Sequence, residues 1–151
     1  MIKINFVCHG NICRSPMAEF LFKDLIKEKG TESEFLVASS ATSTEELGNP
    51  VHYGTAKILD RLGIDYSKKR AVQVQKGDYS KYDLFIGMDE ANVKNLKRLF
   101  GGDPENKVKM LLEYTGIKRG VADPWWTGDF STTYFDVNNG ITALYKTLKG
   151  E

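Results

Sequence analysis

Residues 7–18, with the sequence VCHGNICRSPMA, constrain the fold of this chain more than any other stretch. The β-branched and aromatic residues that lead into them end abruptly at Cys8, a pattern that predicts a buried strand. Ser15 followed by Pro16 predicts a helix start, because serine can cap a helix N-terminus and proline fits the first helical position. Residues 8–14 are therefore expected to form a loop between a strand and a helix.

Loop 8–14 has the composition of an anion-binding turn. Successive backbone N–H groups at a helix N-terminus can point inward around an anion. Gly10 adopts positive φ freely, and Asn11 tolerates it better than most residues. A cysteine at the floor of such a cradle lies in positive potential, which favours the thiolate. Arg14 can donate two hydrogen bonds to one phosphate, so the loop predicts a phosphate site beside a reactive cysteine.

Strand and helix patterns alternate along the rest of the chain. Apolar residues at helical spacing predict helices, and short apolar runs predict strands. We expect helices at residues 16–29, 55–62, 90–100 and 133–148, and strands at residues 2–7, 35–38, 83–88 and 108–112. The alternation predicts a three-layer α/β fold, in which helices flank both faces of a four-stranded, parallel, twisted sheet. Ligands of such sheets bind beyond the carboxyl ends of the strands, where Cys8 lies.

Length and composition fit one domain over residues 1–151. The chain is 41% hydrophobic and has a formal net charge of +1, which gives no overall field for nucleic acid or acidic membranes. Two cysteines and two histidines are too few for a disulfide framework or a metal-ligand cluster. Neither a signal peptide nor a membrane-spanning stretch is visible, so we expect a cytoplasmic protein with reduced thiols.

The segment VCHGNICRSPMAE resembles the phosphate-binding signature of the low-molecular-weight protein tyrosine phosphatases, and the similarity continues through residues 39–50, YDLFIGMDEAN and ADPWW. By itself C-x5-R is a weak pattern, because a small buried cysteine and a surface arginine would also produce it. The resemblance implies that Cys8 forms a phosphocysteine, that Arg14 and the loop amides hold the phosphate oxygens, and that Ser15 hydrogen-bonds the sulfur. The implied phosphate-binding residues are His9, Gly10, Asn11, Ile12, Cys13, Arg14 and Ser15.

Asp123, within ADPWW, matches the family's proton donor. Protonation of the leaving oxygen contributes roughly 100- to 10,000-fold to such a reaction, and the carboxylate can then activate the attacking water. Asp-Pro alone indicates only a turn. Trp125 and Trp126 follow on what we expect to be an exposed loop, where they either cap the sheet or wall the cleft around a phenyl ring. The family more often has tyrosine here, so we expect no regulation by phosphorylation of this pair.

Further residues are expected to support loop 8–14. The resemblance implies that Asn11 holds the loop by hydrogen bonding to a serine at the end of the second strand, either Ser39 or Ser40. Cys13 is either inert or a redox partner that forms a reversible disulfide with Cys8 and protects it from deeper oxidation. The disulfide requires the two sulfurs to reach bonding geometry.

Several positions depart from the family's pattern. His9 stands where an aliphatic residue is common, and Glu45 stands at the cleft rim where many members carry an aromatic or aliphatic residue. A segment that commonly reads His-x-Ala-Arg appears as KRAV at residues 69–72, so a supporting histidine is missing. No catalytic group is lost, but the expected charge of the cleft changes.

The leading hypothesis is a protein tyrosine phosphatase that needs no metal or cofactor. It would act on phosphotyrosine proteins or peptides, release inorganic phosphate, have no nucleic-acid or membrane partner, and be monomeric or weakly self-associating. An arsenate reductase is the nearest alternative, because the same loop serves that reaction. Reductases of this type relay a disulfide through additional cysteines, and none follows Cys13, although a thiol-coupled version stays open. A phosphate-binding module is a third alternative, but simple binding needs neither nucleophile nor proton donor.

Overall fold

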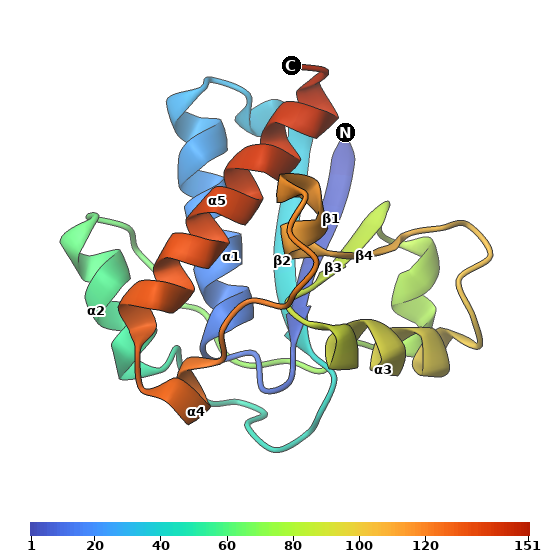
Figure 1. Cartoon of the computed structure of the whole chain (residues 1–151), viewed down its shortest axis with the longest axis horizontal. Helices are drawn as coiled ribbons and strands as arrows, with labels where there is room; N and C mark the ends of the chain where they lie inside the picture. Colours follow the sequence, from blue (N-terminus) through green and yellow to red (C-terminus); the bar gives the residue numbers. More distant parts are fainter.

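The computed structural model, which describes residues 1–151, is a four-stranded parallel sheet with helices on both faces (Figure 1). The strands, in the order β2-β1-β3-β4, are β1 (Ile2–Cys8), β2 (Phe35–Ala41), β3 (Leu84–Gly87) and β4 (Val108–Met110). The α-helices are α1 (Arg14–Glu28), α2 (Tyr53–Arg61), α3 (Glu90–Phe100), α4 (Pro124–Thr127) and α5 (Phe130–Lys149), and the 3-10 helices are η1 (Glu32–Glu34), η2 (Lys76–Ser80) and η3 (Leu111–Thr115). The predicted fold class is confirmed.

Strand β1 lies between β2 and β3 and divides its side chains between two cores. Ile4 and Phe6 face the larger core, whereas Val7 faces the smaller one, as the two-residue period of a strand requires. Cys8 pairs with Ala41 of β2, so β1 and β2 end at the same edge of the sheet. Loop 8–14 therefore starts where parallel sheets bind ligands.

Helices α1 and α5 pack together over the larger core, and α3 covers the smaller one. Phe22 of α1 is fully buried, and its ring lies 5.8 Å from that of Phe6, 5.3 Å from that of Phe35 and 6.2 Å from that of Tyr145. Figure 1 shows α3 well separated from α1 and α5. None of the helices, including the 20-residue α5, combines the length and apolar character needed to cross a membrane.

The start of α1 differs from the prediction. The helix begins at Arg14, and Cys13 occupies the cap position without a side-chain hydrogen bond. Ser15 therefore lies inside the helix, and the prediction that it is the N-cap is wrong. Its hydroxyl is instead directed at Cys8, because a buried polar group must find a partner and the thiol is within reach.

Other element boundaries also shift. Strand β2 continues three residues past position 38, because pairing with β1 extends to its end. The segment after Asp123 forms the short helix α4 in place of the expected loop. Helix α5 begins at Phe130 rather than at 133, because the Asp129 carboxylate accepts the Thr132 N–H and caps it.

Gly140 allows α5 to approach η3 closely. A Cβ at this position would lie 2.5 Å from Cγ of the fully buried Leu111. We expect Gly140→Ala to lower the free energy of unfolding by about 1–3 kcal/mol, because overpacking outweighs the gain in helix propensity. Gly77→Ala is the control, since no atom lies within 4 Å of its Cβ. Urea unfolding should show a change below about 0.5 kcal/mol for Gly77→Ala, and equal losses in the two variants would contradict this packing.

Candidate active site

Loop 8–14 is held from outside through its carbonyl groups. Their oxygens accept hydrogen bonds from the segment between β2 and α2 and from α2 itself; the pairs are Cys8 with Thr42, His9 with Ser43, Ile12 with His52, and Cys13 with Thr55. In a planar trans peptide the N–H points opposite to the C=O. Because the loop carbonyls are hydrogen-bonded on the outer side of the loop, the N–H groups of the same peptides face inward. Inward N–H groups are what an anion-binding loop needs.

Asn11 fixes the turn at the centre of the loop. Its φ is 58°, a left-handed conformation that asparagine tolerates. Its side-chain Nδ2 donates to Ser15 Oγ at 2.8 Å and to Ser39 Oγ at 2.9 Å. Of the two serines left open by the sequence, Ser39 is the partner. Ser40 donates to Asn5 Oδ1 at 2.8 Å, so its predicted role in supporting the loop is wrong.

A buried charged group lies behind Ser39. The Ser39 hydroxyl donates to Glu19 Oε1 at 2.5 Å, and Glu19 Oε2 accepts a hydrogen bond from Lys23 at 2.6 Å. Lys69 Nζ donates to the Ser39 carbonyl at 2.8 Å and lies 3.7 Å from Glu19 Oε1. Burial lowers the pKa of Lys69, and Glu19 opposes that shift. Lys69 thus occupies the position at which the supporting histidine is missing, and no local pattern predicts its pairing with Glu19.

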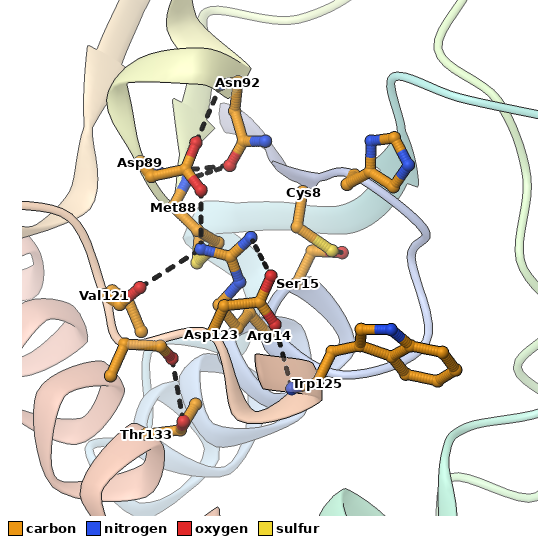
Figure 2. Close-up of polar contacts among 12 residues, drawn as sticks. Cys8, Arg14, Ser15, Met88, Asp89, Asn92, Val121, Asp123, Trp125 and Thr133 are labelled. Atoms are coloured by element: carbon orange, nitrogen blue, oxygen red, sulfur yellow. Dashed lines mark hydrogen bonds and ion pairs between the residues drawn. The ribbon is translucent and has the colours of Figure 1, made fainter. Parts of the chain in front are cut away.

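Cys8 lies at the base of the loop with its sulfur hydrogen-bonded. Its Sγ is 2.9 Å from Ser15 Oγ (Figure 2). The same sulfur accepts the Asn11 N–H at 3.3 Å. Because Ser15 Oγ accepts a hydrogen bond from Asn11 Nδ2, its own hydrogen is free to point at the sulfur. Both donors stabilise negative charge on Sγ.

Arg14 is buried, with a side chain only 3% exposed, and is held between acidic groups. Nη1 donates to Asp89 Oδ2 at 2.8 Å and to the Val121 carbonyl at 3.1 Å, and Nη2 lies 3.4 Å from Asp123 Oδ2 (Figure 2). Burial alone would lower the pKa of Arg14, but the charges of Cys8, Asp123 and Asp89 raise it above its usual value. No role was predicted for Asp89, although it lies in the segment YDLFIGMDEAN that carries part of the family resemblance, directly after a buried strand and at a helix start.

The segment that carries Asp123 is fixed by α5. Asp136 accepts two hydrogen bonds from Arg119, at 2.8 and 3.0 Å, and one from the Ala122 N–H at 3.2 Å. Thr133 donates to the Ala122 carbonyl at 2.8 Å. The Asp123 carboxylate also accepts the Trp125 N–H at 3.1 Å and caps α4 (Figure 2). These contacts direct the carboxylate toward Arg14.

A cavity of about 490 Å³ opens above loop 8–14. The predicted residues among those that line it are Cys8, His9, Gly10, Ile12, Cys13, Arg14, Glu45, Asp123, Trp125 and Trp126; Glu46, Asp89, Ala91, Asn92 and Asn95 were not predicted. Asn11, Ser15 and Ser39 do not line the cavity, and their side chains hydrogen-bond to one another beneath it. Trp125 and Trp126 are 60% and 82% exposed, so they wall the cavity rather than cap the sheet.

Two of the departures from the expected pattern, His9 and Glu45, meet at the rim of the cavity. His9 Nε2 lies 2.9 Å from Glu45 Oε2, and the two side chains remain 55% and 68% exposed. Cys13, by contrast, is buried, and burial raises the pKa of its thiol to about 12, with the charge of Cys8 adding to the shift. Both cysteines are free thiols.

Comparison with known proteins agrees with this geometry. The family model described as low molecular weight phosphotyrosine protein phosphatase matches residues 3–151. The low molecular weight protein-tyrosine-phosphatase YfkJ of Bacillus subtilis is 37% identical over 100% of this chain and 98% of its own. The crystal structure of YfkJ superimposes with a TM-score of 0.94, covering 99% of this chain and 96% of the other. The low molecular weight protein tyrosine phosphatase SP-PTP of Streptococcus pyogenes gives a TM-score of 0.88 at 42% identity, over 98% and 93% of the two chains.

The fold and the cysteine-based anion site define a phosphatase that works through a thiol and needs no metal. With a family match over nearly its whole length, the chain belongs to the low molecular weight phosphotyrosine protein phosphatases. The resemblance noted in the sequence is confirmed.

Two neighbouring serines of β2 test the support of the loop. We expect Ser39→Ala to weaken the inhibition by inorganic phosphate roughly tenfold, because Asn11 and Glu19 both lose a partner, whereas Ser40→Ala should change it less than about twofold. Both substitutions should cost a similar stability of about 1–3 kcal/mol, since each leaves a buried group unpaired. Inhibition constants and urea unfolding measured together separate the two effects. Equal phosphate affinities in the two variants would contradict the role of Ser39.

Asp136 gives a pH-dependent test of the segment that carries Asp123. Hydrogen bonds from Arg119 lower the pKa of Asp136 in the folded protein. The carboxylate therefore stabilises the fold above its unfolded pKa, and this contribution is lost as the pH falls through the folded pKa. We expect Asp136→Asn to cost about 1–3 kcal/mol at pH 7, with a difference from wild type that shrinks toward about pH 3. A difference that stays constant from pH 7 to pH 3 in urea unfolding would contradict this role.

Proposed function

We propose that the protein hydrolyses phosphotyrosine in proteins and peptides with Cys8 as nucleophile, Arg14 as phosphate ligand and Asp123 as general acid and base. The observation that carries the proposal is the convergence of the Cys8 sulfur, the Arg14 guanidinium and the Asp123 carboxylate on one cavity. Each group has its own supporting contacts, so the arrangement is built before substrate arrives.

In the first step the Cys8 thiolate attacks phosphorus. The S–P bond forms while the bond from phosphorus to the tyrosyl oxygen breaks, and Asp123 donates its proton to that oxygen. Arg14 and the inward N–H groups of loop 8–14 hold the three equatorial oxygens, over which the transition-state charge is spread. Asp89 positions the arginine by occupying Nη1.

In the second step water hydrolyses the phosphocysteine. The Asp123 carboxylate takes a proton from the water as its oxygen attacks phosphorus, and the P–S bond breaks to release inorganic phosphate. The Ser15 hydroxyl stabilises the departing thiolate, as it stabilised the attacking one. The protein returns to its starting state without a metal or redox cofactor.

The walls of the cavity favour an aryl phosphate. Trp125 and Trp126 present exposed indole rings at its side, and Ile12 adds an apolar contact near the base. A phenyl ring packs well against such aromatic surfaces. These contacts support phosphotyrosine as the substrate.

The proposal extends to the state of the protein. Residues 1–151 act as one domain, in agreement with the extent of the family match, and the chain is a monomer or self-associates weakly. The two free thiols support a reducing compartment such as the cytoplasm. Cys13 remains the proposed redox partner of Cys8.

Hydrolysis of p-nitrophenyl phosphate and of a phosphotyrosine peptide, with EDTA present, tests the roles of Cys8 and Asp123. Cys8→Ser should abolish turnover while retaining phosphate binding, because the loop amides and Arg14 remain. Asp123→Asn should lower kcat roughly 100- to 10,000-fold for the peptide, and less for p-nitrophenyl phosphate, whose leaving group needs little protonation. Asp65→Asn, which removes an exposed carboxylate outside the cavity, is the control and should leave kcat unchanged.

The alternatives give different results. Loss of turnover on chelation would contradict a metal-independent thiol mechanism. Tight phosphate binding without any turnover would favour a binding module, and arsenite formation with an added thiol would favour a reductase.

A further inference from the structure

A second cavity adjoins the first. It has a volume of about 560 Å³ and lies between α2 and the segment that runs from α4 into α5. Figure 1 shows these elements grouped at one end of the molecule. Trp125 lines both cavities, so a chain that leaves the first can reach the second around one side chain.

The second cavity carries cations that no carboxylate neutralises through an ion pair. Lys57 and Arg61, four residues apart on α2, share one helix face and are both exposed. Neither takes part in any of the ion pairs of the protein. Asp129 also lines the cavity, but its carboxylate accepts the Thr132 N–H at 3.0 Å and the Thr132 hydroxyl at 2.6 Å.

Aromatic rings form a packed wall beside these cations. The ring of His52 lies 4.5 Å from that of Tyr53 and 5.1 Å from that of Phe130, both stacked, and 6.1 Å from that of Trp125. A Cβ on Gly54 would lie 2.4 Å from the Phe130 ring, so the glycine is what lets this ring pack against α2. The wall and the helix that bears the cations therefore keep a fixed relation to Trp125.

The two cavities differ in charge. Apart from Arg14 and His9, the charged groups that line the first are carboxylates, namely Glu45, Glu46, Asp89 and Asp123. The second has two cations and one carboxylate. An acidic residue of a bound peptide is therefore repelled on the side of Glu45 and attracted on the side of Lys57 and Arg61.

We propose that the cavity of Lys57 and Arg61 binds an acidic side chain that flanks the phosphotyrosine in the substrate. The inference deepens the proposed function and rests on it, because the phosphotyrosine must occupy the first cavity. The carboxylate of an aspartate or glutamate accepts hydrogen bonds from the two cations, and its methylene groups pack against the aromatic wall. The enzyme thereby selects phosphotyrosines in acidic sequences and orients the peptide across Trp125.

A peptide scan tests this selection. Each phosphotyrosine peptide carries one Glu, or one Gln in its partner peptide, at a single position. The positions tested extend about four residues to either side of the phosphotyrosine, a reach of roughly 13 Å. At one position or more the Glu peptide should be hydrolysed with a kcat/KM roughly 3- to 10-fold above its Gln partner, mainly through KM. The advantage should shrink at high salt, because these cations are exposed to solvent.

Charge variants identify the cations responsible. Lys57→Ala combined with Arg61→Ala should remove the advantage of Glu while leaving p-nitrophenyl phosphate hydrolysis unchanged, because that substrate is too small to reach α2. Lys57→Glu combined with Arg61→Glu should reverse the preference in favour of a lysine peptide. The matched control is Lys27→Ala with Lys146→Ala, which removes two exposed charges from the far ends of α1 and α5 and should keep the advantage.

The outcomes separate this inference from the proposed function. Equal kcat/KM for every Glu and Gln pair, from an enzyme that does hydrolyse phosphotyrosine, would overturn the inference alone, as would an advantage that survives the double alanine variant. Absence of hydrolysis would overturn the proposed function. In that case binding of the same peptides to Cys8→Ser, followed by fluorescence anisotropy, still decides whether Lys57 and Arg61 favour Glu over Gln.

Discussion

The ion pair between Arg14 and Asp89 is the contact on which the rest of the site depends. It joins the start of α1 to the start of α3, across the edge where β1 and β3 end. A guanidinium buried this deeply needs a counter-charge, because an unpaired buried charge is strongly destabilising. The same guanidinium holds the Val121 carbonyl and faces Asp123. One side chain thus sets the positions of loop 8–14, the start of α3 and the segment that carries Asp123 relative to one another.

Features with a local cause could be predicted from the sequence. The apolar run before Cys8 and the stop at Gly101 placed β1 and α3 closely, because strand burial and helix termination depend on neighbouring residues. Asp89 could not be assigned in the same way. It lies 75 residues from Arg14 along the chain, and locally it is only a helix cap, so its role follows from the order of the strands.

Two predictions about serine were wrong, for different physical reasons. Ser15 does mark a helix start, but its hydroxyl is placed between the Cys8 thiol and the Asn11 amide, and satisfying those buried groups prevails over capping. Ser39 and Ser40 are consecutive on a strand, so their side chains point to opposite faces. Only the register with β1 determines which of them meets Asn11, and that register is a long-range property.

Trp125 forms a shared wall between two cavities of opposite charge, and this has a consequence for ligand design. A small aryl phosphonate can address only the anion cradle that all such phosphatases need. If a carboxylate is linked to the phosphonate around the indole ring, its contact with Lys57 and Arg61 becomes intramolecular once the phosphonate is bound. That contact then acts at a high effective concentration. The linked compound binds more tightly than either group alone. Its selectivity comes from the cavity beside α2 rather than from loop 8–14.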